Sequence, residues 1–387
     1  MSFLPRTVVA LGFVSLLTDL SSEMIYPLLP AFLAGTLGAG PAVLGMIEGV
    51  AEATASLVKI LSGLWADRVR RRKPLVLAGY SLSGACRPLI GLAGSWVSVL
   101  GLRFGDRIGK GLRTSPRDAL IADAVAPTVR GQAFGFHRSM DHAGAVLGPL
   151  AASGLLAVGV GLRSVFLLAA VPAAAVVLAI LWGVREAASP DPAEPPGTPA
   201  AGSPLSLSPG FRRLLAAVTL FTLGNSTDAF LLLRLSGAGV TTSGVALLWS
   251  AHHGIKMVST YAGGRLSDRL GRKPLLVSGW FYYAAVYAGF AVAVSRSGLI
   301  ALFLAYGVYY GLTEPVERAW AADLSTRGLR GRAYGFYHGA VGLAALPASL
   351  LFGALWSSFG APVAFFTGSA LALASSVLLV FVPSRPS

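Results

Sequence analysis

Ionisable side chains interrupt the apolar stretches of this 387-residue chain, and their spacing indicates proton chemistry. Asp19 and Glu23 are four residues apart and would share one face of a helix. A carboxyl group withdrawn from water binds a proton more tightly, and histidine titrates in the physiological range. We therefore expect proton coupling by at least one of these, unless each carboxylate is paired structurally with a buried base. The candidates are Asp19, Glu23, Glu52, Asp228 and His253.

A second group of side chains is basic. Arg103, Arg107 and Lys110 fall on one stripe of a predicted helix. Arginine binds carboxylates and phosphates through its bidentate fork, so an anionic substrate is one hypothesis. The alternative is internal pairing with Asp106, Asp141, Glu23 and Glu52. The candidate substrate-binding residues are Arg87, Arg103, Arg107, Lys110, Lys256 and Tyr310.

The elements that position these residues are membrane helices. Hydrophobic residues make up 54% of the chain and charged residues 12%, whereas a soluble domain carries roughly 25% charged residues. Apolar stretches of about 20 residues, the length that crosses a bilayer, recur throughout. We predict an all-α integral membrane protein with twelve transmembrane helices. They cover about 8–33, 42–66, 74–94, 96–117, 130–156, 162–184, 212–235, 243–264, 274–294, 298–321, 331–355 and 361–382.

The net charge of +14 is distributed as in a membrane protein. Basic residues cluster in the loops that follow even-numbered spans, while segments 34–41 and 236–243 carry no charge. Because positively charged loops stay in the cytoplasm, we expect both termini there. We therefore expect the lipid bilayer as a partner of the protein and expect no binding of nucleic acid.

The chain also contains a duplication. The segment that begins at Gly63 returns at Gly264, so that Asp67 matches Asp268, and the one that begins at Arg130 returns at Arg330. We predict two six-helix bundles, 1–186 and 210–387, related by a pseudo-two-fold axis. The Pro-, Ala-, Gly- and Ser-rich stretch 187–209 is the predicted cytoplasmic linker. Matching halves in a membrane favour a transporter, with a receptor or scaffold as the alternative.

Both copies of the repeated segment resemble the loop signature between the second and third spans of the major facilitator superfamily. The first copy has one extra residue, and Arg70 stands where glycine is usual. Each aspartate can receive an arginine or a helix N-terminus from a neighbouring helix. The resemblance implies the fold of that superfamily and a cytoplasmic gate. The residues of the gate motif are Gly63, Asp67, Arg68, Arg72, Lys73, Gly264, Asp268, Arg269, Arg272 and Lys273.

The fifth predicted span resembles the antiporter signature of drug–proton exchangers in the same superfamily. Its residues are Gly135, Gly144, Gly148 and Pro149. Gly144 and Gly148 lie one turn apart and would let a neighbouring helix approach closely. Ala152 and Ser153 replace the usual closing glycines.

These features predict a secondary active transporter in the cytoplasmic (inner) membrane of a bacterium. We expect proton-coupled export of a small molecule by alternating access, with the protein functional as a monomer. Uptake or facilitated transport of an organic anion is the alternative. No G-x-x-x-x-G-K-[ST] loop is present, so ATP is not the expected energy source. No nucleophile–base pair indicates an enzyme. His252 and His253 lack further ligands at metal-site spacing, so neither a metal nor another cofactor is expected.

Overall fold

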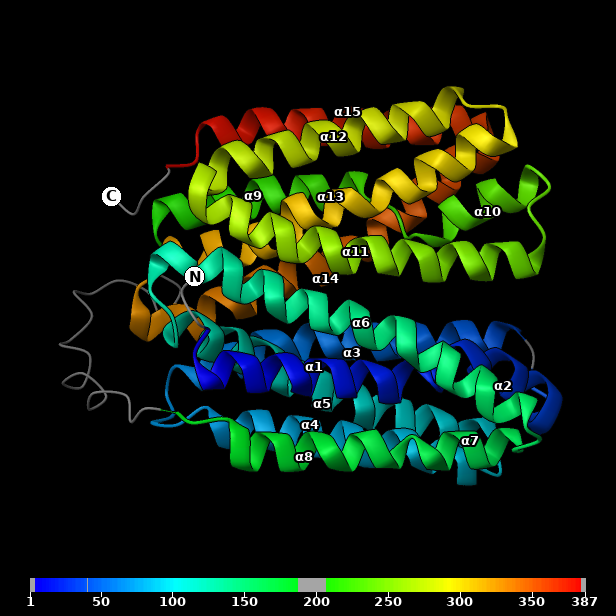
Figure 1. Cartoon of the computed structure of the whole chain (residues 1–387). Helices are drawn as coiled ribbons and strands as arrows, with labels where there is room; N and C mark the ends of the chain where they lie inside the picture. The colour runs from blue at the N-terminus through cyan, green and yellow to red at the C-terminus, as the bar shows by residue number, and fades with distance from the viewer. Residues whose placement is uncertain (1–3, 40, 187–206, 384–387) are drawn as a thin grey trace. The chain divides into compact units, whose positions relative to one another are not determined.

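The computed structural model describes residues 4–39, 41–186 and 207–383, and their regular secondary structure is helical throughout (Figure 1). The predicted all-helical class is therefore confirmed for these residues. The α-helices are α1 (Arg6–Glu23), α2 (Leu29–Leu37), α3 (Pro41–Ala66), α4 (Lys73–Leu89), α5 (Trp96–Asp123), α6 (Arg130–Ala157), α7 (Leu162–Leu168), α8 (Ala170–Gly183), α9 (Pro209–Gly224), α10 (Ala229–Gly237), α11 (Thr242–Leu270), α12 (Arg272–Val292), α13 (Arg296–Asp323), α14 (Arg330–Phe359) and α15 (Ala361–Val380).

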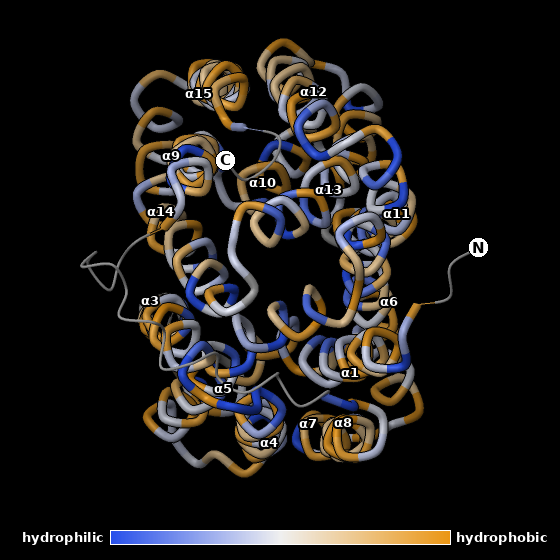
Figure 2. The backbone as a smooth tube through the Cα atoms, turned by 90° about the vertical axis from the view of Figure 1, so that its left-hand side faces the viewer, coloured by the Kyte–Doolittle hydropathy of each residue, from blue (hydrophilic) through white to orange (hydrophobic). Residues whose placement is uncertain are grey.

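Each predicted span coincides with one helix or with two consecutive helices. Within the described residues, eight such segments are long and apolar enough to cross a membrane. The other four predicted spans correspond to α3, α5, α6 and α11, which carry many of the charged candidate residues. Figure 2 shows α8 and α15 as largely hydrophobic helices, whereas hydrophilic stretches occur on α5. The number of twelve membrane spans stays a prediction.

Three predicted spans are interrupted, and local sequence explains two of the breaks. Between α1 and α2, Pro27 and Pro30 remove backbone donors, and a short 3₁₀ turn, Tyr26–Leu28, joins the helices. Between α9 and α10 lies the polar run Asn225-Ser226-Thr227-Asp228. A broken helix frees backbone groups, which is tolerated at membrane depth only where protein groups satisfy them. The Tyr283 hydroxyl does this by donating to the Gly224 carbonyl at 3.1 Å.

The chain divides into two compact units that do not follow the repeats strictly. Unit 1 comprises Met1–Val125, Met140–Gly202 and Arg327–Gly339. Unit 2 comprises Ala126–Ser139, Ser203–Thr326 and Ala340–Ser387. The first turns of α14 thus belong to unit 1 and those of α6 to unit 2. The predicted division at 186 and 210 stays a prediction, and residues 187–206 of the predicted linker lie outside the described residues. Pro209 already begins α9.

Aromatic side chains fill the interior of unit 2. Phe221 stacks on Trp280 with ring centroids 4.6 Å apart, and Tyr283 stacks on Tyr287 at 4.1 Å. All four side chains are buried. Such rings contribute large apolar contact areas, so they fix α9 against α12 and hold the α9–α10 break in place.

Candidate functional site

The first repeated aspartate holds the beginning of a distant helix. Asp67 directly follows α3, and its carboxylate accepts backbone N–H bonds from Gly331 and Arg332, each at 2.7 Å. These N–H groups belong to the first turn of α14 and have no partner within that helix. A negative charge at this position is stabilised by the helix dipole. Arg72 lies 3.6 Å from the same carboxylate.

The second aspartate makes the same contact within unit 2. Asp268 accepts N–H bonds from Gly131 at 2.9 Å and Gln132 at 2.7 Å, at the start of α6. Arg272 binds the carboxylate at 2.5 Å. The helix N-terminus and the arginine were alternatives in the sequence, and each aspartate lies close to both. Their role as gate elements stays a prediction.

A second carboxylate completes each contact. In unit 1, Asp123 binds both Arg72 and Arg330. In unit 2, Asp323 binds Arg130 at 2.5 Å and Arg272 at 3.0 Å. We call these sets network 1 (Asp67, Arg72, Asp123, Arg330) and network 2 (Asp268, Arg272, Asp323, Arg130). Charge-assisted bonds of this kind are roughly twice as strong as neutral ones, so each network fixes a helix start firmly.

Glycine permits this close approach. A methyl group on Gly63 would lie 2.4 Å from the Gly331 carbonyl oxygen, and one on Gly264 would lie 2.1 Å from that of Gly131. Gly335 and Gly135 face the same two glycines from the opposite helices. Gly135, the first residue of the antiporter-type motif, therefore packs against α11.

The Asp67 carboxyl is expected to make stability depend on pH. Burial, only partly offset by its hydrogen bonds and by Arg72, raises the pKa of Asp67 from 3.8 to about 6. The folded protein then binds more protons than the unfolded chain between about pH 4 and 6. The contribution of Asp67 to the free energy of unfolding is therefore largest at low pH and is lost as the pH rises through about 6, by about 3 kcal/mol.

Thermal unfolding of wild type and Asp67→Asn between pH 4 and 7 tests this expectation. The variant should lack the component of the pH profile that the wild type shows in this range. Identical profiles of the two proteins would remove Asp67 as its source.

A charge cluster lies inside unit 1. Glu23 of α1 interacts electrostatically with Lys110 and Arg107 of α5, and Glu52 of α3 interacts with the same two bases. Lys59 lies 3.8 Å from Glu52. Five charged residues that are separated in sequence are thus brought together, and two of the predicted proton-coupling acids share their cationic neighbours.

Two other predicted substrate-binding residues have an internal partner. Arg87 donates to Asp106 at 2.8 Å, and Arg103 lies 3.2 Å from the other oxygen of the same carboxylate. Asp106 is buried, with 1% of its surface exposed. A buried carboxylate needs such cations, so this geometry favours a structural role for Arg87 and Arg103.

The antiporter-type glycines of α6 pack on the acidic face of α1. A methyl group on Gly144 would lie 2.9 Å from Cβ of Asp19, and one on Gly148 would lie 2.5 Å from Cβ of Glu23. Pro149 follows within the helix. The motif and the two predicted proton-coupling acids of α1 therefore form one helix–helix contact.

Unit 2 has its own buried acid–base pair. Asp228, at the start of α10, lies 3.4 Å from Nζ of Lys256 and accepts hydrogen bonds from Tyr310 at 3.1 Å and Tyr306 at 3.2 Å. The Lys256 ammonium also lies 3.6 Å from the centroid of the Tyr310 ring. The structure thus joins three predicted site residues with Tyr306, which the site prediction missed although it lies four residues from Tyr310.

The histidine pair lies on the same helix as Lys256. His252 is fully buried, and its Nδ1 is 3.0 Å from the Phe303 carbonyl oxygen. His253 packs edge-on against Trp249, with ring centroids 5.0 Å apart. Among the described residues, no group of three or more His, Cys, Asp or Glu side chains is arranged to hold a metal ion.

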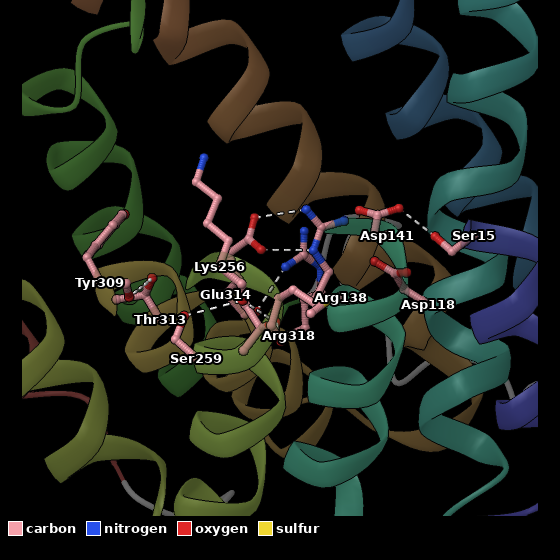
Figure 3. Close-up of polar contacts among 12 residues, drawn as sticks. Ser15, Asp118, Arg138, Asp141, Lys256, Ser259, Tyr309, Thr313, Glu314 and Arg318 are labelled. Atoms are coloured by element: carbon pink, nitrogen blue, oxygen red, sulfur yellow. Dashed lines mark hydrogen bonds and ion pairs between the residues drawn. The ribbon is translucent and has the colours of Figure 1, made fainter. Parts of the chain in front are cut away.

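Two further side-chain pairs were not foreseen from the sequence. Arg138 binds Glu314 through Nε at 2.9 Å and Nη2 at 3.0 Å, as the dashed lines in Figure 3 show. Asp118 lies 2.7 Å from Nε2 of His338. Asp141 accepts a hydrogen bond from Ser15 at 2.5 Å. The repeat offset of 200 aligns His338 with Arg138, and this alignment could have identified His338 as a candidate.

Comparison with known proteins decides the family. The model of the Major Facilitator Superfamily matches residues 11–252 and 232–387. The chain belongs to this superfamily. An uncharacterised MFS-type transporter of Methanocaldococcus jannaschii is 34% identical over 396 residues, which cover 98% of this chain and 95% of that protein.

Solved structures agree in fold. The human organic anion transporter MFSD10 superimposes with a TM-score of 0.79 at 20% identity, over 97% of this chain and 99% of that one. The proton:xylose symporter XylE gives 0.80 at 16% identity, over 98% and 96%. Such low identities show the fold alone. As a major facilitator, the protein is a multi-pass membrane transporter of small molecules rather than an enzyme.

Proposed function

We propose that this major facilitator is a proton-coupled antiporter that exports a small molecule by alternating access. One observation carries the proposal: the glycine face of α6 packs directly on the turns of α1 that bear Asp19 and Glu23. A change of charge at Glu23 therefore acts on a helix contact in which the glycines of α6 place no side chain between the two backbones. The antiporter type of the resemblance and the predicted coupling acids converge at this contact.

The surroundings of Glu23 fit a coupling role. When ionised, Glu23 balances the nearby cations Lys110 and Arg107. A proton on Glu23 removes that balance and changes the electrostatic free energy of unit 1. Coupling requires that proton and substrate bind with different affinities to two conformations. Glu23 would meet this requirement if the second conformation holds Lys110 and Arg107 at other distances from it. Asp228 with Lys256 is the corresponding candidate in unit 2.

The remaining parts of the proposal follow the charge pattern and the repeats. We place the loops that carry networks 1 and 2 on the cytoplasmic side of a bacterial inner membrane, with both termini there, because basic loops stay inside. The halves 1–186 and 210–387 would move relative to each other, with the two networks acting as inner gates. The proposed exporter works as a monomer.

Transport of an organic anion has less support. Of its candidate ligands, Arg87 and Arg103 already bind Asp106, and Arg107 and Lys110 interact with Glu23 and Glu52. If the protein carries anions, Arg107→Gln should abolish the transport of anionic compounds and leave that of other compounds unchanged. An exporter of cations or neutral compounds should keep its substrate range.

The experiment is flux in proteoliposomes that contain a pH-sensitive dye. A panel of lipophilic cations, neutral drugs and carboxylates is added under an imposed pH gradient. We expect at least one compound to drive proton movement, Glu23→Gln to reduce it to the level of empty liposomes, and Glu23→Asp to retain it. Exchange by Glu23→Gln with the pH dependence of the wild type would exclude Glu23 as the coupling acid. Compound flux with no proton movement in the wild type would exclude antiport.

A further inference from the structure

A buried carboxylate–imidazole pair joins α5 to the beginning of α14 within unit 1. Asp118 has no exposed surface, and His338 is 8% exposed. One oxygen of Asp118 lies 2.7 Å from Nε2 of His338. The other accepts two bonds from Arg117, at 2.8 and 2.9 Å. The proposed antiport mechanism uses none of these three residues.

The residue that corresponds to His338 in the other repeat does not titrate near neutral pH. At the repeat offset His338 corresponds to Arg138, which binds Glu314 with two hydrogen bonds. A guanidinium keeps its charge at every physiological pH, whereas an imidazole gains or loses its charge there. At this position one repeat therefore has a permanent cation and the other a titratable base. Each contacts a carboxylate, although Glu314 and Asp118 do not themselves correspond at the repeat offset.

Several charged and titratable residues lie on the helices near the pair. Arg117 of α5 interacts with the carboxylates of both Asp118 and Asp141, the latter on α6. The other neighbours are Tyr80 of α4, Arg113 of α5, Lys59 of α3, whose carbonyl accepts from Ser115, and the Tyr334 and Tyr337 rings of α14.

We propose that His338 and Asp118 form a proton-binding site separate from Glu23 and Asp228. Protonation makes the contact a charge-assisted bond, which is roughly twice as strong as a neutral one. It then fastens α14 to α5 about 12 Å inside the helix start that network 1 holds. Because α14 continues from unit 1 into unit 2 after Gly339, this bond constrains the chain where it passes between them. The effect on transport rests on the proposed function, whereas proton binding itself does not.

The direct test is NMR of protein labelled with ¹³C at histidine Cε1, in detergent, between pH 5 and 8. The chain has five histidines, so His338 is assigned by the resonance missing from His338→Gln. We expect this resonance to titrate reversibly in the wild type, and its titration to move in Asp118→Asn. Arg138→Gln, which removes the permanent pair, is the matched control and should leave the titration unchanged. A His338 resonance that does not titrate, or one unaffected by Asp118→Asn, would overturn the proposal.

Flux measurements then separate this site from the coupling acid. His338→Gln and His338→Arg should both still exchange, with less dependence on the pH at the side of the basic loops. Glu23→Gln should abolish exchange but leave the His338 titration in place. If both His338 variants exchange with the unaltered pH profile, the site has no role in transport. If Glu23→Gln still exchanges while His338 titrates as expected, the antiport proposal fails and the proton-binding site at His338 stands.

Discussion

Replacing Asp228 by Asn alone is expected to destabilise the protein by about 3–5 kcal/mol, because it removes the carboxylate that is hydrogen-bonded to the buried ammonium of Lys256. Lys256 is 3% exposed and lies 3.4 Å from the carboxylate. The double variant Asp228→Asn/Lys256→Met should recover most of this loss, because it removes the isolated charge. Thermal and denaturant unfolding of the purified proteins measure both effects.

Tyr310→Phe gives the matched control. It removes one donor to Asp228 but keeps the ring against which Lys256 lies, so a loss of about 1 kcal/mol is expected. A double variant as unstable as Asp228→Asn alone would show that the pair is not the source of the effect. Flux by the stable double variant then tests coupling separately: exchange with intact pH dependence would exclude Asp228 as a proton carrier.

Gly263→Ala is expected to be the most disruptive change of a single methyl group in α11. The added carbon would lie 1.8 Å from the Gly311 carbonyl oxygen of α13, a backbone atom that cannot rotate away. Separating the two helices should lower stability by about 3 kcal/mol or more. The measurement is the unfolding temperature in detergent, together with the yield of folded protein.

The same helix offers an internal control for this prediction. Gly254 of α11 has no atom within 4 Å of an added methyl group. Gly254→Ala should therefore be neutral or slightly stabilising, since alanine favours the helix by about 1 kcal/mol. Equal losses from the two substitutions would mean that helix packing at Gly263 is not what limits stability.

The repeat made part of this architecture predictable. Asp67 and Asp268 recur at the same offset, and each receives a helix start and an arginine, the two partners that its chemistry allows. Pro27 and the polar run at Asn225 also mark the helix breaks in the sequence. The breaks were not predicted, because the spans were defined by the length of their apolar stretches alone.

The partners of the buried charges were not predictable in the same way. Helical periodicity places Arg103 and Arg107 on one stripe but does not tell which neighbouring helix supplies an acid. Asp106 is bound by Arg87 of α4 as well as by Arg103, a pairing set by the packing of α4 on α5. The repeat aligns His338 with Arg138, but His338 was overlooked because the two side chains have different chemistry.

The exchanged helix starts affect how the duplicated chain can have arisen and how it folds. Unit 1 is completed by Arg327–Gly339 and unit 2 by Ala126–Ser139, each taken from the other repeat. One repeat alone would leave Asp67 or Asp268 without the helix N-terminus that it binds, and would leave a helix start uncapped. A half-length ancestor with this design would have needed a second copy to complete itself, as domain-swapped dimers do. Fusion of two copies would make that exchange intramolecular and independent of protein concentration.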